Sequence, residues 1–194
     1  MSTFLNGTVW MYQMLDKITT FLKYKANVWK IKSTLIRNRW IKAKGIYPSY
    51  YDEKKLIFIH IPKAAGRSVS NSIFGDDKPG HYYSSDYKSV SEEKFDEYFK
   101  FAFVREPLDR LHSSYNYLTS GGGNDVDRLF GQILKKSTNS FEDFVLNWLT
   151  TERLNSWIHF VPQHKYIYLQ DGECGVDFIG KFENIDSDFD KLKE

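Results

Sequence analysis

The chain has 194 residues, of which 41% are hydrophobic and 27% charged; this composition fits one globular domain and excludes an intrinsically disordered chain. Its formal net charge of +2 does not by itself require a polyanionic partner such as nucleic acid. The charge is uneven, because no Asp or Glu occurs between Lys17 and Tyr51, and this stretch is a local basic arm.

The first fifty residues have the pattern of an amphipathic helix. Apolar side chains recur at three- and four-residue spacing, as at Met11, Leu15 and Ile18. Asp16 interrupts any apolar run that could span a bilayer, so we expect neither a signal peptide nor a membrane anchor. We therefore expect residues 1–50 to form a basic helical arm. It either packs on its own domain or makes contact with a membrane surface or a partner.

A single cysteine, Cys174, rules out an intramolecular disulfide. A reducing compartment fits such a chain better than an oxidising one. We therefore expect a cytoplasmic protein, with the inner face of a membrane as the site of any peripheral contact.

From residue 51 to residue 194 the chain alternates short apolar runs with stretches of helical periodicity. The runs are rich in β-branched and aromatic residues, as buried parallel strands are. This alternation predicts an α/β domain, a P-loop-like three-layer fold whose mainly parallel sheet is flanked by helices. The expected strands span residues 55–61, 99–104, 166–169 and 178–182, and the expected helices span residues 67–74, 91–98, 107–118, 126–136 and 140–149. A last helical pattern from Ile185 stops with the chain, which leaves open whether the chain is naturally short or cut.

A phosphate-binding loop is predicted between the first strand and the first helix. Gly66 lets the backbone approach an anion, the helix start offers free N–H groups, and Lys63 adds a mobile positive charge. The ATP-type pattern G-x-x-x-x-G-K-[ST] is absent, and no apolar strand ends in an aspartate suited to holding magnesium. A sulfuryl donor explains the difference, because the transferred group carries about one negative charge where a terminal phosphoryl group carries about two. We therefore expect a site without a metal.

This loop resembles the 5'-phosphosulfate loop of the carbohydrate sulfotransferases, especially the membrane-associated and bacterial group with the motif I-P-K-T-A-G-T-S. The corresponding residues are Ile61, Pro62, Lys63, Ala64, Ala65, Gly66, Arg67 and Ser68, with Ala64 in the place of the motif's first threonine. The resemblance implies that the loop from Pro62 to Ser68 binds 3'-phosphoadenosine 5'-phosphosulfate (PAPS) and that Lys63 is catalytic. Arg67 departs from the motif, since it adds charge where the family has a small hydroxyl residue.

A second run, from Phe101 to Tyr115, resembles the same family's 3'-phosphate element, F-V-R-D-P-x-x-R-x-x-S-x-Y. Arg105 leaves the carboxyl edge of a strand, and its planar guanidinium can bind a phosphate through two hydrogen bonds. Ser113 lies two helical turns further on and can donate to the same phosphate. Arg110 we expect on the helix surface, paired with an acidic residue one turn away, Glu106 or Asp109.

Two anion sites at corresponding strand ends are what a nucleotide with both a 5' and a 3' phosphate requires. The resemblance implies transfer of a sulfuryl group from PAPS to a hydroxyl of a carbohydrate or related acceptor. His81 resembles in position the histidine that uronyl 2-O-sulfotransferases use as general base, and we expect that role for it. His164 we expect to contact the acceptor, together with loops at residues 82–90 and 120–126. His159 has no informative sequence context.

The sequence leaves two other functional hypotheses open. A P-loop-like nucleotide or small-molecule kinase shares the strand–loop–helix site, although its magnesium-holding residues are missing. A non-catalytic nucleotide- or glycan-binding protein would keep the anion sites without turnover. We expect no nucleic-acid partner, because basic helices are commonly solvated surfaces, and the sequence does not indicate an oligomeric state.

Overall fold

The computed structural model describes residues 41, 43, 45–75 and 80–192. The chain divides into two compact units, Met1–Gly45 and Ile46–Glu194, and every element described below lies in the second. The expected helical arm falls almost wholly outside the described residues, apart from its last few, which enter helix α2 (Ser49–Lys54). Among the residues with described placement, no helix is long and apolar enough to cross a membrane.

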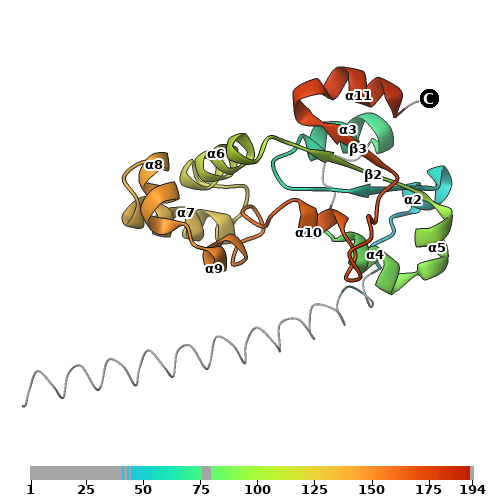
Figure 1. Cartoon of the computed structure of the whole chain (residues 1–194), viewed down its shortest axis with the longest axis horizontal. Helices are drawn as coiled ribbons and strands as arrows, with labels where there is room; N and C mark the ends of the chain where they lie inside the picture. Colours follow the sequence, from blue (N-terminus) through green and yellow to red (C-terminus); the bar gives the residue numbers. More distant parts are fainter. Residues whose placement is uncertain (1–40, 42, 44, 76–79, 193–194) are drawn as a thin grey trace, which may run out of the picture. The chain divides into compact units, whose positions relative to one another are not determined.

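The second unit is built on a parallel sheet of three strands in the order β1-β2-β3 (Figure 1). Strand β1 is Leu56–Ile59, β2 is Phe99–Val104 and β3 is Phe178–Lys181. Both neighbouring pairs are parallel, so all three strands end at the same edge of the sheet. The predicted α/β fold with a parallel sheet flanked by helices is confirmed.

Helices connect and cover the strands. Local sequence sets several of their starts: the Ser91 side chain accepts a hydrogen bond from the backbone N–H of Lys94, and Pro107 occupies the first turn of its helix, where the missing N–H costs nothing. The remaining helices are α3 (Gly66–Phe74), α4 (Ser84–Val90), α5 (Glu92–Glu97), α6 (Pro107–Thr119), α7 (Asp125–Ser137), α8 (Phe141–Asp143) with a π-helical continuation (Phe144–Trp148), α9 (Thr151–Leu154), α10 (His164–Ile167) and α11 (Ile185–Lys191) after a 3-10 turn (Phe182–Asn184).

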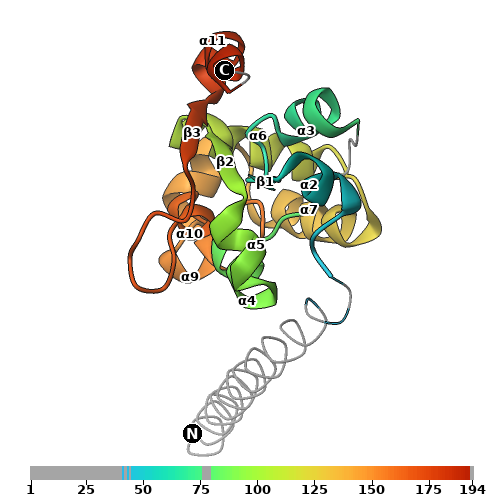
Figure 2. The same cartoon turned by 90° about the vertical axis from the view of Figure 1, so that its right-hand side faces the viewer.

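The sheet is buried between two layers of helices. Phe58 of β1 stacks on Phe101 of β2 with 4.9 Å between ring centroids, and Phe74 of α3 reaches the same face at 6.5 Å from Phe101. Figures 1 and 2 show α3 on one side of the sheet and α4 with α10 on the other. Apolar burial on both faces explains why the β1 and β2 sequences are almost continuously hydrophobic.

A second hydrophobic cluster lies among α6 to α9, on the side where the strands end (Figure 1). Its fully buried members are Leu118, Leu134, Phe144 and Phe160. The cluster fixes α6 against α7, and the turn between these two helices faces the end of β1. This helical part therefore supplies one wall of the site described below.

Two predictions about local structure were wrong. The expected strand at residues 166–169 does not form: its first two residues belong to helix α10, His164–Ile167, and Tyr168 makes only an isolated bridge with Cys174. A four-residue apolar run fits a buried strand and a buried helical turn equally well, so its periodicity could not decide. The expected acceptor loop at residues 82–90 is largely helix α4, whose Asp86 carboxylate accepts the backbone N–H of Tyr83 and whose Tyr87 is buried.

Candidate functional site

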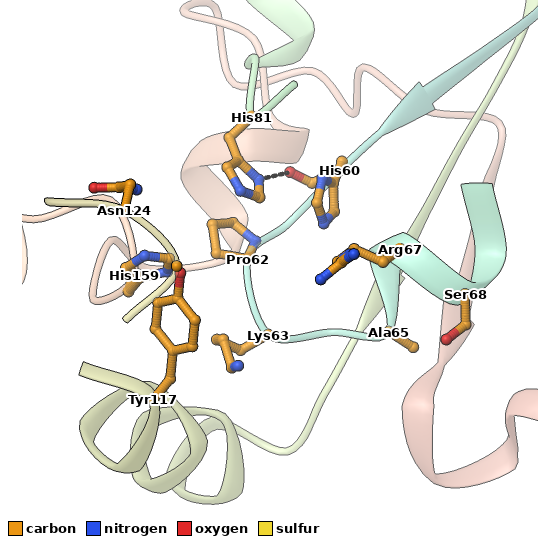
Figure 3. Close-up of a pocket in the computed structure, with 12 residues that line it drawn as sticks. His60, Pro62, Lys63, Ala65, Arg67, Ser68, His81, Tyr117, Asn124 and His159 are labelled. Atoms are coloured by element: carbon orange, nitrogen blue, oxygen red, sulfur yellow. Dashed lines mark hydrogen bonds between the residues drawn. The ribbon is translucent and has the colours of Figure 1, made fainter. Parts of the chain in front are cut away.

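A cavity of about 710 Å³ opens at the carboxyl end of the sheet (Figure 3). The loop after β1 forms one wall, three histidines form the back, and the turn between α6 and α7 forms the opposite wall. The lining residues are Pro62, Lys63, Ala65, Gly66, Arg67 and Ser68; His60, His81 and His159; and Tyr117, Gly123 and Asn124. The structure thus brings together the predicted loop residues and His81, except Ala64, which is buried and does not line the cavity.

The loop has the backbone geometry of an anion cradle. Lys63 and Ala65 both have positive φ angles, 67° and 60°, which non-glycine residues adopt only at an energetic cost. Ala65 is the N-cap of α3, and no side-chain hydrogen bond caps the helix there; a helix start of this kind can bind an anion through its backbone N–H groups. A Cβ on Gly66 would lie 1.8 Å from His60 Cδ2, so the close packing of loop and histidine requires glycine here.

Lys63 projects into the cavity without a carboxylate partner among the residues that the structure describes. Its ammonium nitrogen lies 4.3 Å from the centroid of the Tyr117 ring. Burial, and next the positive charge of Arg105, lower the pKa of Lys63. Lys63 and Arg105 follow neighbouring parallel strands, β1 and β2, so both residues lie beyond the same edge of the sheet.

Arg105 follows β2 directly and is held on several sides. The Gln163 side chain brackets its backbone: Oε1 accepts the Arg105 N–H at 2.9 Å, and Nε2 donates to the Arg105 carbonyl at 2.7 Å. The guanidinium carbon lies 4.3 Å over the ring of Phe182, the residue after β3, and Nε is buried without a hydrogen-bond partner. Ser113 is half-buried on α6, two turns away. Neither Arg105 nor Ser113 lines the cavity itself.

Arg110 does not lie on the helix surface, and the predicted pairing with Glu106 or Asp109 is wrong. Its side chain is only 4% exposed and donates hydrogen bonds to three carbonyls, those of Pro62, His159 and Val161. Burial lowers the pKa of Arg110 to about 10. Helical spacing allowed a surface ion pair, but the carbonyls of two loops distant in sequence offer better hydrogen bonds in a buried place. Arg110 therefore connects the loop after β1 to the segment that carries His159.

His81 has one ring nitrogen bound to a backbone carbonyl. Its Nδ1 lies 3.2 Å from the His60 carbonyl oxygen, which can only accept, so Nδ1 carries the proton and Nε2 is left with a free lone pair (Figure 3). Burial is the main influence on this histidine and lowers its pKa. His81 is therefore neutral at pH 7 and able to take a proton at Nε2.

His159, Asp127 and Tyr117 are site residues that the sequence did not reveal. Asp127, 5% exposed on α7, accepts hydrogen bonds from the Tyr117 hydroxyl at 3.0 Å and from the Asn124 amide at 2.8 Å. Its other oxygen lies 3.4 Å from His159 Nε2. Burial lowers the pKa of His159 to about 4, so the ring is neutral and donates to the carboxylate. The sequence carried a signal only for the contact between Asn124 and Asp127. An asparagine three residues before an acidic residue is typical of a helix N-cap, and here the Asn124 side chain accepts the backbone N–H of Asp127.

His164 lies outside the cavity lining. It is exposed at the first position of α10, and its contact with an acceptor stays a prediction. Among the described residues, no group of three or more His, Cys, Asp or Glu side chains is arranged to hold a metal ion.

Comparison with known proteins agrees with this arrangement. Residues 50–194 match the model of a family described as the sulfotransferase family, and the matched region contains the sheet, the loop after β1 and the whole cavity. No curated protein and no solved structure shows a significant match to the chain. The family match covers well over half of the chain. The chain therefore belongs to the sulfotransferase family, whose members are enzymes that transfer sulfuryl groups.

Proposed function

We propose that this protein transfers the sulfuryl group of PAPS to a hydroxyl of a carbohydrate or related acceptor. The observation that carries the proposal is the placement of Lys63 and Arg105 after neighbouring parallel strands, with the open start of α3 beside them. Because β1 and β2 are neighbouring parallel strands, the two residues follow strand ends at the same edge of the sheet, as the two phosphate ends of one nucleotide require. Ligands bind beyond the carboxyl ends of strands in sheets of this kind.

Each anionic group of the donor has a matching element in this proposal. The loop from Pro62 to Ser68 holds the 5'-phosphosulfate with its backbone N–H groups and with Lys63. Arg105 and Ser113 hold the 3'-phosphate, with the Arg105 backbone fixed by Gln163 and its guanidinium flanked by Phe182. The sulfuryl group carries about one negative charge, which positioned N–H groups and cations can stabilise. The proposal therefore includes no metal.

The chemistry is an in-line displacement at sulfur. The acceptor oxygen forms a bond to sulfur while the bond from sulfur to the bridging oxygen breaks, and that electron pair stays on the 5'-phosphate of the departing nucleotide. Lys63 neutralises the charge that develops on this oxygen. The acceptor's proton passes to Nε2 of His81, which is free to accept it. The acceptor then lies against the wall formed by Tyr117, Gly123 and Asn124.

The proposal also places the reaction in the cytoplasm. Cys174 is the single cysteine and is exposed, so the protein needs no oxidising compartment for a disulfide. A carbohydrate acceptor would then be met there or at the inner face of a membrane, where residues 1–50 could make peripheral contact.

Calorimetry with adenosine 3',5'-bisphosphate and adenosine 5'-monophosphate tests the donor site. We expect the bisphosphate to bind about 10- to 150-fold more tightly, because a charge-assisted bidentate contact stabilises the 3'-phosphate. Arg105→Ala should remove most of this difference. Arg128→Ala, which changes an exposed arginine paired with Asp125, is the control and should keep it.

Equal affinity of the wild-type protein for the two nucleotides would contradict the proposed donor. The acceptor is tested by incubating protein and PAPS with a panel of carbohydrates and following the bisphosphate product. Transfer of a phosphoryl group from ATP, or tight PAPS binding without turnover on any acceptor, would instead support a kinase or a non-catalytic binding protein.

A further inference from the structure

Tyr117 lies in the cavity although no family motif includes it. It is two residues beyond the Tyr115 that ends the second motif, and its ring faces the loop after β1 (Figure 3). The Lys63 ammonium nitrogen is 4.3 Å from the ring centroid. The face of an aromatic ring attracts a cation through its quadrupole, and this attraction uses none of the ammonium's three N–H donors.

The Tyr117 ring is itself firmly held. Its hydroxyl donates to the buried carboxylate of Asp127 at 3.0 Å, and the Asn124 amide donates to the same oxygen. On the other side, a Cβ on Gly123 would lie 2.5 Å from the hydroxyl, so a larger residue there would have to move the Tyr117 side chain. The His159 ring packs against the Tyr117 ring in a T-shaped arrangement, with 4.9 Å between the two ring centroids. A ring fixed in this way can hold a flexible lysine in one place.

An aromatic partner suits a lysine that must respond to a new charge. A carboxylate partner would form an ion pair that competes with the leaving oxygen, whereas an aromatic face has no net charge. No ion pair between Lys63 and a carboxylate occurs in the described part of the chain. The left-handed backbone at Lys63 fixes the direction in which its side chain leaves the loop, and the ring then fixes its far end.

We infer that Tyr117 is a positioning residue for Lys63, with Asp127, Asn124 and Gly123 holding its ring. The ring keeps the ammonium group in the cavity with its N–H donors free for the leaving oxygen. The role assigned to the lysine rests on the proposed function, but the contact between lysine and ring can be tested without turnover.

Nuclear magnetic resonance of protein with ¹³C-labelled lysine tests the contact. Protons above an aromatic ring are shielded, so the Lys63 ε-methylene signal, assigned by its loss in Lys63→Arg, should lie upfield of the other lysines. Tyr117→Leu should return it to the ordinary position, and Tyr117→Phe should keep it upfield. Tyr168→Leu, which removes an exposed tyrosine, is the control and should leave it unchanged. An unshifted Lys63 signal in the wild-type protein would overturn the inference.

A double-mutant cycle tests whether Tyr117 acts through Lys63. Lys63→Ala should lower kcat by about 10² to 10³, as does loss of a donor to a developing oxyanion. Tyr117→Leu should lower kcat by about 2- to 30-fold, the range of a cation–π contact, with a smaller effect on the affinity for adenosine 3',5'-bisphosphate. The double variant should be no slower than Lys63→Ala alone, because without the lysine side chain the Tyr117 ring has no ammonium group to position.

A kcat of the double variant that is lowered by the product of the two single-variant factors would overturn the inference. Thermal unfolding shows whether Tyr117→Leu is folded. If it is not, Tyr117→Phe is used instead, which loses the hydrogen bond to Asp127 and keeps the ring. Tyr117→Phe should lower kcat less, and this loss should again vanish in the Lys63→Ala background. A wild-type protein without any sulfuryl transfer would refute the proposed function instead, and the resonance experiment would still decide the contact.

Discussion

At the scale of single residues, the three histidines of the cavity share a location but differ in surroundings. His60 packs against Gly66 and stacks on Phe58, which makes it part of the loop's support. His159 is bound to Asp127, and its Nδ1 is buried without a hydrogen-bond partner. His81 lies between them, with ring centroids 4.1 Å from His60 and 6.4 Å from His159. Of the three, His81 has its tautomer fixed by a carbonyl oxygen and a lone pair free to act.

The pH dependence of kcat tests the role of His81. Burial lowers its pKa below the ordinary 6.5, while the bond to the His60 carbonyl and the charge of Asp127 oppose this. Because a general base works in its neutral form, kcat should be constant near neutrality and should fall as the pH drops through that lowered pKa. His81→Ala should lose this acidic limb together with about 10² to 10⁴ in rate. His112→Ala, at an exposed position on α6, is the control.

An acidic limb and a rate in His81→Ala equal to those of the wild-type protein would exclude His81 as the base. Loss of the limb in His159→Ala alone would transfer the role to His159. These two outcomes are distinguishable because each variant removes one ring and leaves the other in place.

At the scale of elements, the pair α6 and α7 decides the shape of the cavity wall. The two helices approach so closely that a Cβ on Gly131 would lie 1.9 Å from the carbonyl oxygen of Leu118. The close approach brings Asp127, on the first turn of α7, next to Tyr117, on the last turns of α6. Packing in the helical cluster thus determines where the ring that faces Lys63 lies.

Gly131→Ala tests this packing. Alanine favours a helix over glycine by roughly 1 kcal/mol, but the clash here is with a backbone carbonyl that cannot rotate away. We expect the clash to prevail and to destabilise the protein by about 1–3 kcal/mol, measured as the change in unfolding free energy in urea. Gln132→Ala, at the neighbouring exposed position, is the control and should be nearly neutral. A Gly131→Ala protein as stable as the control would show that the two helices can separate at little cost.

At the scale of the whole molecule, the chain has two compact units, and all described site residues belong to the second. The sheet, the helical cluster and the cavity lie between Ile46 and Leu192, and the family match begins at residue 50. The chemistry and the main hydrophobic cores therefore fall within a single unit.

Removal of residues 1–45 tests the independence of that unit. We expect the shortened protein to keep the wild-type affinity for adenosine 3',5'-bisphosphate and a cooperative thermal transition, because its strands and both proposed anion-binding elements are complete. Calorimetry and circular dichroism measure the two properties. A shortened chain that fails to fold or to bind the nucleotide would assign part of the core to the first unit.

Much of the fold could be predicted because it depends on local sequence. The runs at β1 and β2 are apolar and long enough to be recognised, and Pro107 together with the Ser120–Asn124 turn marks the bounds of α6. The short run at residues 166–169 was assigned wrongly, since four apolar residues carry no distinguishing period. The helix α4 was missed because its polar sequence resembles a loop until Tyr87 is seen to be buried.

The amino-acid sequence alone determined the two predicted anion-binding elements and their order. A strand that ends in a glycine-containing loop and an arginine that follows a strand are both defined by residues adjacent in the chain. The tertiary structure alone decided that Arg110 is buried, that Asp127 holds His159 and Tyr117, and that the Tyr117 ring lies over Lys63. The physical reason is that most of these contacts join residues far apart in the chain, so they arise only when the helical cluster packs against the end of the sheet.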